Sequence, residues 1–446
     1  MALSRIWAAF IIISVLVAGI KYAFFANDRD IFSTMVTGKT GDTIRLRQIG
    51  PAVAVPLKAP ATYRIQNANG IIETCNTAVT LSIGLIGIMA LFMGLMSIAE
   101  QAGGIRFLSR IVGPFFSKLF PELPKGHPAM GHMVMNFSAN LLGLDNAATP
   151  FALKAMDSLQ ELNPDKNTAS NTQIMFLCLH QSGLQLIPVT VIALRASAKV
   201  ADPTDLFIPI VIATFVTTIA SMCIVSYRQK INIFQPVILL WVGGLSAIIA
   251  GIVIYLHTLN ADGIQSFSRA LGNGLILLIF LLIVAGAVYK RINIFDAFVQ
   301  GAKGGFETAI RIIPYLVGML VAISMLRTSG TFDALINGLK HLFTALGTDT
   351  RFVDGLPTAL IKPLSSAGAR GMLVDTMQTF GKDSFAARLS GILQGSSEST
   401  FYVVAVYFGA ISVRNTRYAI SSMLLADLVS IITSIFLCYM FFGHLQ

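Results

Sequence analysis

Residues 135–156 read MNFSANLLGLDNAATPFALKAM, a run in which amides, hydroxyls and one carboxylate interrupt an otherwise apolar segment. Polar groups without partners are costly at membrane depth, so their presence there needs an explanation. Backbone that leaves the helical path at this depth is tolerated only where protein buries it or where it lines a polar cavity. We therefore predict that residues 126–157 form a re-entrant helical hairpin and not a complete span.

A second stretch, residues 352–380, has the same character. It contains KPLSSAGARGMLVD at 362–375, where serines and glycines predict a turn that exposes backbone. Each stretch follows an amphipathic segment, Ile105–Phe120 in the first case and Phe332–Leu346 in the second. This order predicts an interfacial helix that leads into a re-entrant hairpin.

The composition places both hairpins in a membrane protein. Hydrophobic residues make up 54% of the 446-residue chain and charged residues 12%, whereas soluble domains carry about 25% charged residues. The apolar residues form runs of about 20, which is the length of a membrane span. Windowed apolarity predicts nine spans, at roughly 7–27, 78–99, 172–195, 205–227, 235–257, 271–289, 305–326, 385–412 and 416–442. The predicted fold class is an all-α integral membrane protein with about nine transmembrane helices and two re-entrant hairpins.

Basic residues in three short loops predict the orientation, because Lys and Arg collect on the cytoplasmic side. These residues are Arg228, Lys230, Lys290, Arg291, Lys303, Arg414 and Arg417. The N-terminus is then cytoplasmic and the C-terminus extracytoplasmic, in a bacterial inner membrane. The same rule accounts for the net charge of +10, and the absence of a basic stripe with interleaved aromatic residues excludes nucleic acid as a partner.

The first 77 residues divide into two predicted parts. Residues 1–27 form an N-terminal membrane anchor helix, for which a cleaved signal peptide is the alternative. Residues 28–77 form an extracytoplasmic loop with short strands within Thr43–Ile49 and Thr62–Gln66.

The order of the remaining elements predicts an internal repeat. A span, an amphipathic helix, a polar hairpin, a broken span and a closing span occur in 78–227 and again in 305–442. Five crossings separate the first span of one copy from that of the other, so the copies run in opposite directions. Inverted repeats whose interrupted segments meet near the midplane are a recurring transporter design. The two predicted repeat domains are 78–228 and 229–446.

Polar side chains of both copies are candidates for binding a polar solute. They are Asn136, Ser138, Asn140, Asn146, Thr149, Gln181, Ser182, Gln185, Ser365, Ser366, Arg370, Gln394, Ser396, Ser397, Glu398 and Ser399. The alternative for the hairpin residues is structural, as helix caps or as contacts with neighbouring segments. Within the first hairpin, Pro150 fits the first turn of a helix that starts near Asn146.

The two predicted broken spans carry the rest of this set. Gly183 and Pro188 predict that span 172–195 unwinds, and its polar groups then pair with a ligand or with the freed backbone. Glu398 lies within span 385–412, and an ionisable group in a span indicates function by default. The alternative for Glu398 is a salt bridge to Arg370, while Arg370 itself is expected to clamp an anion or to pair with Asp375 or another carboxylate.

Motifs of other protein classes are absent from the sequence. It has no P-loop, zinc motif, G-x-S-x-G or Gly-rich dinucleotide turn. The four cysteines and six histidines form no metal-like cluster. We therefore expect neither an enzyme nor an ATP-driven pump, and no cofactor or bound metal.

Two long stretches resemble known families. FPELPKGHPAMGHMVMNFSANLLGLDNAATPFALKAMDSLQELN resembles the spore maturation protein A family, and KPLSSAGARGMLVDTMQTFGKDSFAARLSGILQGSSESTFYVVAVYFG resembles the spore maturation protein B family. The chain is similar to a fusion of the two, joined near Arg228–Asn232. Both families contain the Gate, or nucleoside recognition, domain, which is shared with ferrous-iron transport protein B and with concentrative nucleoside transporters. The resemblance implies a helical Gate fold with hairpins, and it supplies no substrate.

These observations lead to one expected function and one alternative. The first is a secondary transporter of a small polar solute, which is nucleoside-like or derived from the cell wall. The expected coupling ion is H⁺ or Na⁺. The alternative is a membrane scaffold or regulator of envelope or spore maturation that transports nothing. Metal-ion transport is a third reading, which the lack of Cys, Met and His at the hairpin tips disfavours. The expected partners are the lipid bilayer and the solute, and homo-oligomerisation is left open.

Overall fold

A computed structural model describes residues 2–25, 30–38, 43–44, 63–64, 70–124, 126–143, 145–259 and 261–444. Within these residues the fold is helical apart from one short antiparallel ladder, β1 (Thr43–Ile44) with β2 (Tyr63–Arg64). Both strands lie inside the stretches where strands were predicted, and the remainder of those stretches lies outside the described residues.

Among the described residues, six helices are long and apolar enough to cross a membrane, which makes the chain a multi-pass membrane protein. They are α1 (Ala2–Phe24), α3 (Ile71–Gln101), α9 (Phe207–Gln229), α10 (Pro236–His257), α11 (Ala261–Tyr289) and α18 (Ala419–Phe442). All six coincide with predicted spans. A seventh predicted span, 305–326, lies within the longer helix α12 (Ile294–Thr328).

The other two predicted spans are broken near their middles. Span 172–195 consists of α7 (Asn171–Ser182) and α8 (Val189–Ser197), with extended chain between them. Span 385–412 consists of α16 (Phe385–Gly395), α17 (Thr400–Val403) and the π-helical segment η3 (Val404–Phe408). We call the two interruptions break 1 (183–188) and break 2 (396–399).

Break 1 follows directly from its sequence. Gly183 has a φ of +23°, a conformation that residues with a Cβ rarely adopt. Pro188 has no N–H to donate, so it cannot continue the hydrogen-bond ladder of a helix. Helix α7 therefore ends at Ser182, as predicted. Break 2 contains neither glycine nor proline. Of its side chains, Ser396 Oγ donates to the carbonyl oxygen of Leu393 in the last turn of α16, at 3.0 Å.

Both predicted hairpins are helical, and each follows an amphipathic helix. In the first half, α4 (Gly104–Leu119) precedes α5 (Pro128–Leu141) and α6 (Asp145–Leu162). In the second half, α13 (Thr331–Ala345) precedes η2 (Arg351–Gly355), α14 (Leu356–Ile361) and α15 (Ser366–Phe380). Pro150 departs from its predicted position, because α6 starts at Asp145 and Pro150 is then in the helix interior.

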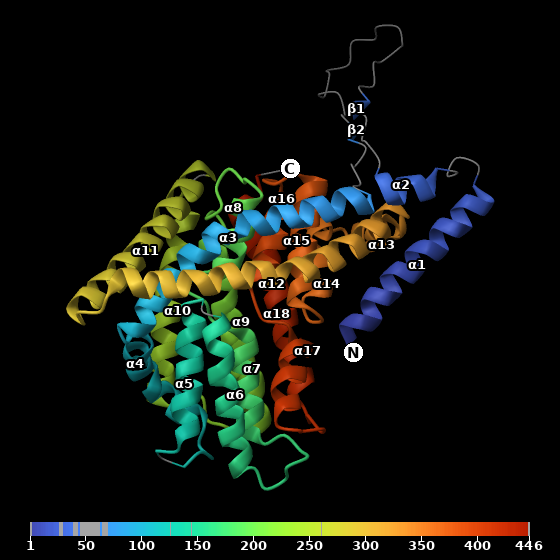
Figure 1. The fold of residues 1–446 in the computed structure, drawn as a ribbon. Helices are drawn as coiled ribbons and strands as arrows, with labels where there is room; N and C mark the ends of the chain where they lie inside the picture. Colours follow the sequence, from blue (N-terminus) through green and yellow to red (C-terminus); the bar gives the residue numbers. More distant parts are fainter. Residues whose placement is uncertain are drawn as a thin grey trace.

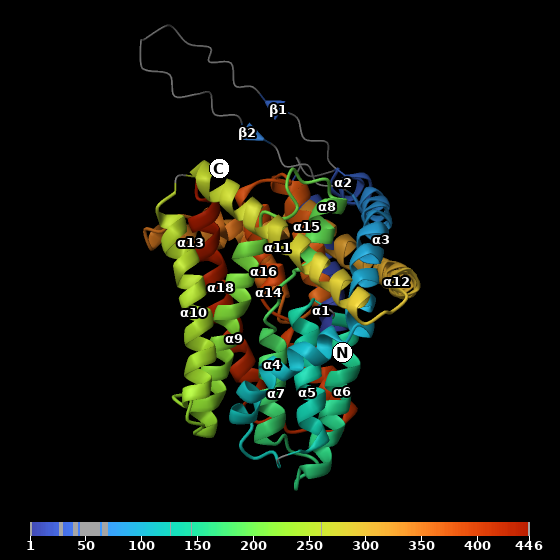
Figure 2. The same cartoon turned by 90° about the vertical axis from the view of Figure 1, so that its left-hand side faces the viewer.

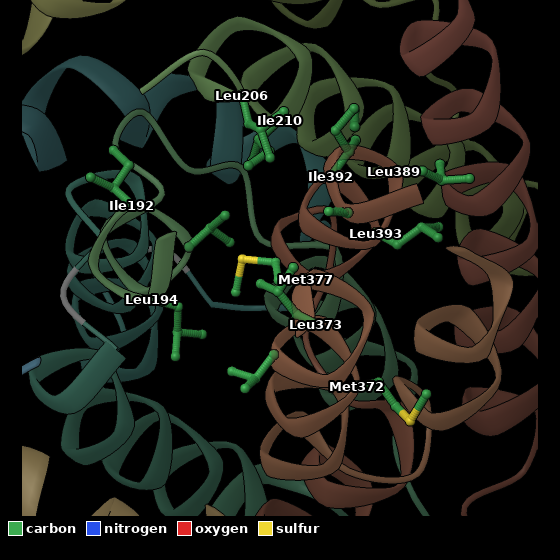
Figure 3. Packing of buried hydrophobic residues seen from close by; sticks show 14 of the residues in the cluster. Ile192, Leu194, Leu206, Ile210, Met372, Leu373, Met377, Leu389, Ile392 and Leu393 are labelled. Carbon is green, nitrogen blue, oxygen red and sulfur yellow. The ribbon is translucent and has the colours of Figure 1, made fainter. Parts of the chain in front are cut away.

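The two halves interlock. Helix α3 packs along α12, and α9 packs along α18, so each pair joins one helix from either half. Helices α5, α6 and α7 occupy the lower half of the molecule, whereas α15 and α16 occupy the upper half, in both views (Figures 1 and 2). Buried apolar side chains of α15 and α16 meet those of α8 and α9 in the main core (Figure 3).

Glycines set the close approach of α3 and α12. A Cβ on Gly305 would lie 2.6 Å from the carbonyl oxygen of Met89, and one on Gly301 would collide with the carbonyl of Met93. Small residues let membrane helices approach closely because no side chain separates the backbones. The pair is thus held by backbone contact that a side chain would prevent.

We expect Gly305→Leu to force α3 and α12 apart and to lower the melting temperature of the purified protein in detergent. The matched control is Gly286→Leu on α11, where an added Cβ meets nothing within 4 Å. The loss should be about 1–3 kcal/mol, the cost of overpacking, for Gly305 and close to zero for Gly286. Equal losses for the two variants would contradict the packing argument.

Candidate functional site

Breaks 1 and 2 lie against each other. The Glu398 N–H donates to the carbonyl oxygen of Gln181 at 2.7 Å, and the Gln181 side-chain Nε2 donates to the carbonyl oxygen of Glu398 at 3.2 Å. These two bonds join the last turn of α7 to break 2 directly. The two interruptions lie more than two hundred residues apart in the sequence, and they form one site. We call this site, around Gln181 and Glu398, the crossing.

Asp427 of α18 accepts hydrogen bonds from residues of both broken helices at the crossing. Its carboxylate is buried, with 4% of the residue exposed. One oxygen accepts from Gln181 Nε2 at 2.7 Å and from Ser397 Oγ at 3.0 Å. The other accepts from Thr400 Oγ1 at 2.7 Å. A single carboxylate thus binds groups from both broken helices.

His180 connects the first hairpin to the crossing. Its Nδ1 lies 3.0 Å from Asn136 Oδ1 and 3.0 Å from Asn140 Nδ2, both on α5. Asn136 Nδ2 donates to the carbonyl oxygen of Ala148 at 2.7 Å, which directs Asn136 Oδ1 towards the histidine. The ring of Tyr407 on η3 meets His180 edge to face at 4.9 Å. His180 is therefore held between the first hairpin and the second broken helix.

Each hairpin tip is tied to the break of its own half. The Leu186 N–H donates to the carbonyl oxygen of Leu141 at 2.8 Å, and the Phe401 N–H donates to that of Pro363 at 2.9 Å. In the second half, Ser366 Oγ also lies 2.7 Å from Ser399 Oγ. The backbone groups that the breaks release are thus partly satisfied by the hairpins.

Lys362 lies at the tip of the second hairpin and is buried, with 5% exposed. Its ammonium donates to the carbonyl oxygen of Gln394 in the last turn of α16. The side-chain oxygens of Gln181 and Gln394 are buried and lack a hydrogen-bond partner among the described residues. The crossing therefore holds two carboxylates, one ammonium and two unused amide acceptors.

Both outer ends of the broken helices meet as well. At one end, Arg195 of α8 and Arg388 of α16 share the carboxylate of Asp205, at 2.7 and 2.9 Å. At the other end, Arg417 Nη1 donates to Asn171 Oδ1 at 3.0 Å, beside the start of α7. Polar contacts therefore join the two halves at both outer ends of the broken helices.

The structure brings most of the predicted residues to the crossing or to its supports. Asn136, Asn140, Gln181, Ser366, Ser397, Glu398 and Ser399 make the contacts above. Ser365 caps α15 by accepting from Gly368 N at 3.0 Å, and Ser396 accepts from Ser430 Oγ at 2.8 Å. Gln394 contributes its carbonyl oxygen and its unused side-chain oxygen.

Other predicted residues are turned to local partners. Ser138 and Ser182 donate to carbonyl oxygens of their own helices, Val134 and Leu179. Gln185 is half-buried in break 1, and Thr149 is half-buried in α6. The side chain of Asn146 lies outside the described residues. Whether any of the predicted residues binds a solute stays a prediction.

The expected partners of Arg370 are different in the structure. Asp375 pairs with Arg327, whose Nε lies 2.7 Å from both carboxylate oxygens. Within the described part of the chain no ion pair joins Arg370 to Glu398; Arg370 Nε donates to the carbonyl oxygen of Ser366 at 3.3 Å. Glu398 Oε2 instead accepts from Ser366 Oγ at 3.3 Å. The salt bridge considered for Glu398 is thus replaced by a hydroxyl contact.

Sequence reasoning did not select His180, Lys362 or Asp427 as site residues. Asp427 carried a usable signal, because it is an ionisable residue within an apolar span. The sequence does not distinguish His180 from the other histidines, which are scattered along the chain. Among the described residues no group of three His, Cys, Asp or Glu side chains could hold a metal ion. The crossing is therefore suited to hydrogen bonding and charge pairing.

Comparison with known proteins places these residues in a family context. The sequence profile of the Gate family, described as nucleoside recognition, matches residues 82–300 and 309–414. Spore maturation protein B of Bacillus subtilis (strain 168) is 42% identical over 175 residues, which are 38% of this chain and 97% of that protein. Spore maturation protein A of the same organism is 42% identical over 170 residues, which are 37% of this chain and 87% of that protein. No solved structure matches the chain.

Proposed function

Because the chain belongs to the Gate family of nucleoside recognition domains, we propose that it is a secondary transporter that carries a small polar solute across the membrane. The observation that carries this proposal is the crossing, where two broken helices hydrogen-bond to each other through Gln181 and Glu398. Discontinuous helices in transporters present backbone and side-chain groups to substrates and ions within the bilayer. The carboxylates and unused amide oxygens of the crossing would bind hydroxyl and amino groups of the solute.

The proposal includes two repeats of inverted topology. Each half has a long helix, an amphipathic helix, a hairpin, a broken helix and a closing helix, in the same order. The packing of α3 on α12 and of α9 on α18 pairs corresponding elements. Helices α5–α7 and α15–α16 lie in opposite halves of the molecule (Figure 1), which supports opposite orientation. Nine membrane spans and a location in the inner membrane are also part of this proposal.

The proposed orientation places the N-terminus in the cytoplasm and the C-terminus outside. The basic loops near Arg228, Lys290 and Arg414 support it. The C-terminal end of α18 and the β1–β2 pair lie at the same end of the molecule (Figures 1 and 2), as this orientation requires.

In the proposed transport cycle each hairpin moves together with a broken helix. The backbone bonds Leu186–Leu141 and Phe401–Pro363 fasten each tip to its break, so independent movement of a hairpin would strip buried backbone groups of their partners. The Arg195–Asp205–Arg388 contacts at one end and the Arg417–Asn171 contact at the other would then open in turn. H⁺ and Na⁺ are the coupling ions to be tested.

A scaffold or regulator of envelope or spore maturation is the second candidate. It is favoured by one observation, that the Asp427 carboxylate binds Gln181 of one broken helix and Ser397 and Thr400 of the other, and so holds the two halves together. A site built only for rigidity would look the same in this respect. Binding and flux measurements separate the two candidates.

The test uses the purified full-length protein in detergent and in proteoliposomes. Nucleosides and cell-wall fragments are screened by thermal shift, and hits are followed as labelled solute uptake under an imposed H⁺ or Na⁺ gradient. We expect Glu398→Gln and Ser366→Ala to weaken binding about tenfold, which corresponds to about 1.4 kcal/mol. The control is Glu161→Gln at an exposed position of α6.

Two results would reject the proposed function. One is the failure of every solute in both solute classes to stabilise the protein or to enter the vesicles. The other is a hit whose binding neither Glu398→Gln nor Ser366→Ala changes, because the solute would then bind outside the crossing.

A further inference from the structure

The helix ends that lead into the two breaks differ in the charge of the groups that meet them. At the end of α16, before break 2, the Lys362 ammonium donates to the Gln394 carbonyl oxygen. At the end of α7, before break 1, the donors are neutral: Ser182 Oγ donates to the Leu179 carbonyl and the Glu398 N–H to the Gln181 carbonyl. Among the described residues, the second half therefore places a fixed cation where the first half places neutral donors.

The surroundings of Lys362 are those of a cation site. A helix C-terminus carries a partial negative charge from its unsatisfied carbonyls. The side-chain oxygen of Gln394 is a buried acceptor without a partner among the described residues. The buried carboxylate of Asp427 accepts from Ser397 of break 2. Carbonyl, amide and carboxylate oxygens are the ligands that hard cations prefer, and the Lys362 ammonium contacts the first of these, the Gln394 carbonyl oxygen, directly.

Asp427 needs a positive charge nearby. Its three assigned hydrogen bonds come from an amide and two hydroxyls, which are neutral. Among the described residues no lysine, arginine or histidine nitrogen lies within 4 Å of this carboxylate, so it has no direct ion pair there. A buried charge without compensation is unfavourable at membrane depth. Lys362 is a buried cation of the crossing and lies at the tip of the neighbouring hairpin.

We propose that the Lys362 ammonium is a tethered cation at break 2, and that it fills the place which a free monovalent cation would otherwise take. Break 2 then binds no exchangeable cation, and any coupling ion must bind elsewhere in the protein. The inference goes beyond transport, because it also holds for a protein that moves no solute.

The first experiment measures the melting temperature of the full-length protein in NaCl, KCl and choline chloride at equal ionic strength. Any difference in the wild-type melting temperature among the three salts is expected to persist in Asp427→Asn, because a cation that binds elsewhere does not use this carboxylate. Lys362→Ala is expected to melt several degrees lower in choline chloride and to regain stability in NaCl or in n-propylammonium chloride. The propylammonium ion matches the part of the lysine side chain that the substitution removes.

Two controls separate charge from space filling. 1-Propanol has the length of the lost segment without its charge and should not restore Lys362→Ala. Lys340→Ala removes a lysine that pairs with Asp354 outside the crossing, and its melting temperature should not respond to propylammonium. Equal rescue of Lys362→Ala by propanol and propylammonium would overturn the proposal, and so would Lys362→Ala with wild-type stability in choline chloride.

Two further results decide the remaining cases. A Na⁺-specific rise in the wild-type melting temperature that Asp427→Asn abolishes would overturn the proposal, because a free cation would already share the site. If Lys362→Ala does not fold, Lys362→Met is compared with Lys362→Met/Asp427→Asn. The double variant should be the more stable of the two, since it removes both charges, and a double variant no better than the single one would overturn the proposal.

Discussion

Asp427→Ala is expected to destabilise the protein by at least about 3 kcal/mol, because the substitution leaves three buried donors without an acceptor and each such loss costs about 1–3 kcal/mol. The donors are Gln181 Nε2, Ser397 Oγ and Thr400 Oγ1, at 2.7, 3.0 and 2.7 Å from the carboxylate. Because they belong to both broken helices, the crossing should loosen as a unit. The measurement is thermal or denaturant-induced unfolding of the purified protein.

Asp427→Asn serves as the matched variant. The asparagine oxygen can keep the Gln181 and Ser397 bonds, and the Thr400 hydroxyl can rotate to accept from the new amide. We expect a smaller loss than in Asp427→Ala, attributable to the missing charge. Adding Thr400→Val to Asp427→Ala should reduce its penalty, since one unsatisfied donor is then removed. Additive losses in that double variant would show that Thr400 does not depend on Asp427.

The local features of the fold were predictable from the sequence. Gly183 and Pro188 act on their own backbone, so break 1 could be placed without knowledge of its neighbours. The amphipathic stretches before the two hairpins gave α4 and α13 for the same reason. Break 2 has no such backbone signal, and its position depended on reading the polar run around Glu398 as an interruption.

The partners within the site were less predictable, because they come from distant segments. Asp427 meets Gln181 from 246 positions away, and His180 meets Asn136 from 44 positions away. Polar spacing along one helix cannot reveal either contact. From the sequence, Arg370 is expected to clamp an anion or to pair with Asp375 or another carboxylate. In the structure, Asp375 instead pairs with Arg327 of α12.

That ion pair determines how firmly the second hairpin is attached. Arg327 and Asp375 are 7% and 8% exposed, and the guanidinium also lies over the ring of Phe332 at 4.6 Å. The pair joins α12, which packs on α3, to α15 of the hairpin. The part of the second half that carries Ser366 is thereby fixed to the α3–α12 pair.

Arg327→Ala is expected to cost about 3–5 kcal/mol, because it leaves the Asp375 carboxylate buried without a counter-charge. Replacing both partners by leucine removes that charge and should recover most of the loss, since apolar residues often substitute for a buried pair without penalty. The exposed pair Arg351–Asp349, with side chains 40% and 44% exposed, is the control. Asp349→Asn removes this ion pair and keeps an acceptor for the Arg351 N–H, so it should cost no more than about 1 kcal/mol. Unfolding in detergent measures all three variants. If the double leucine variant is as unstable as Arg327→Ala, the loss comes from packing around Phe332 and not from the unpaired carboxylate. Apolar contacts would then hold the hairpin to α12.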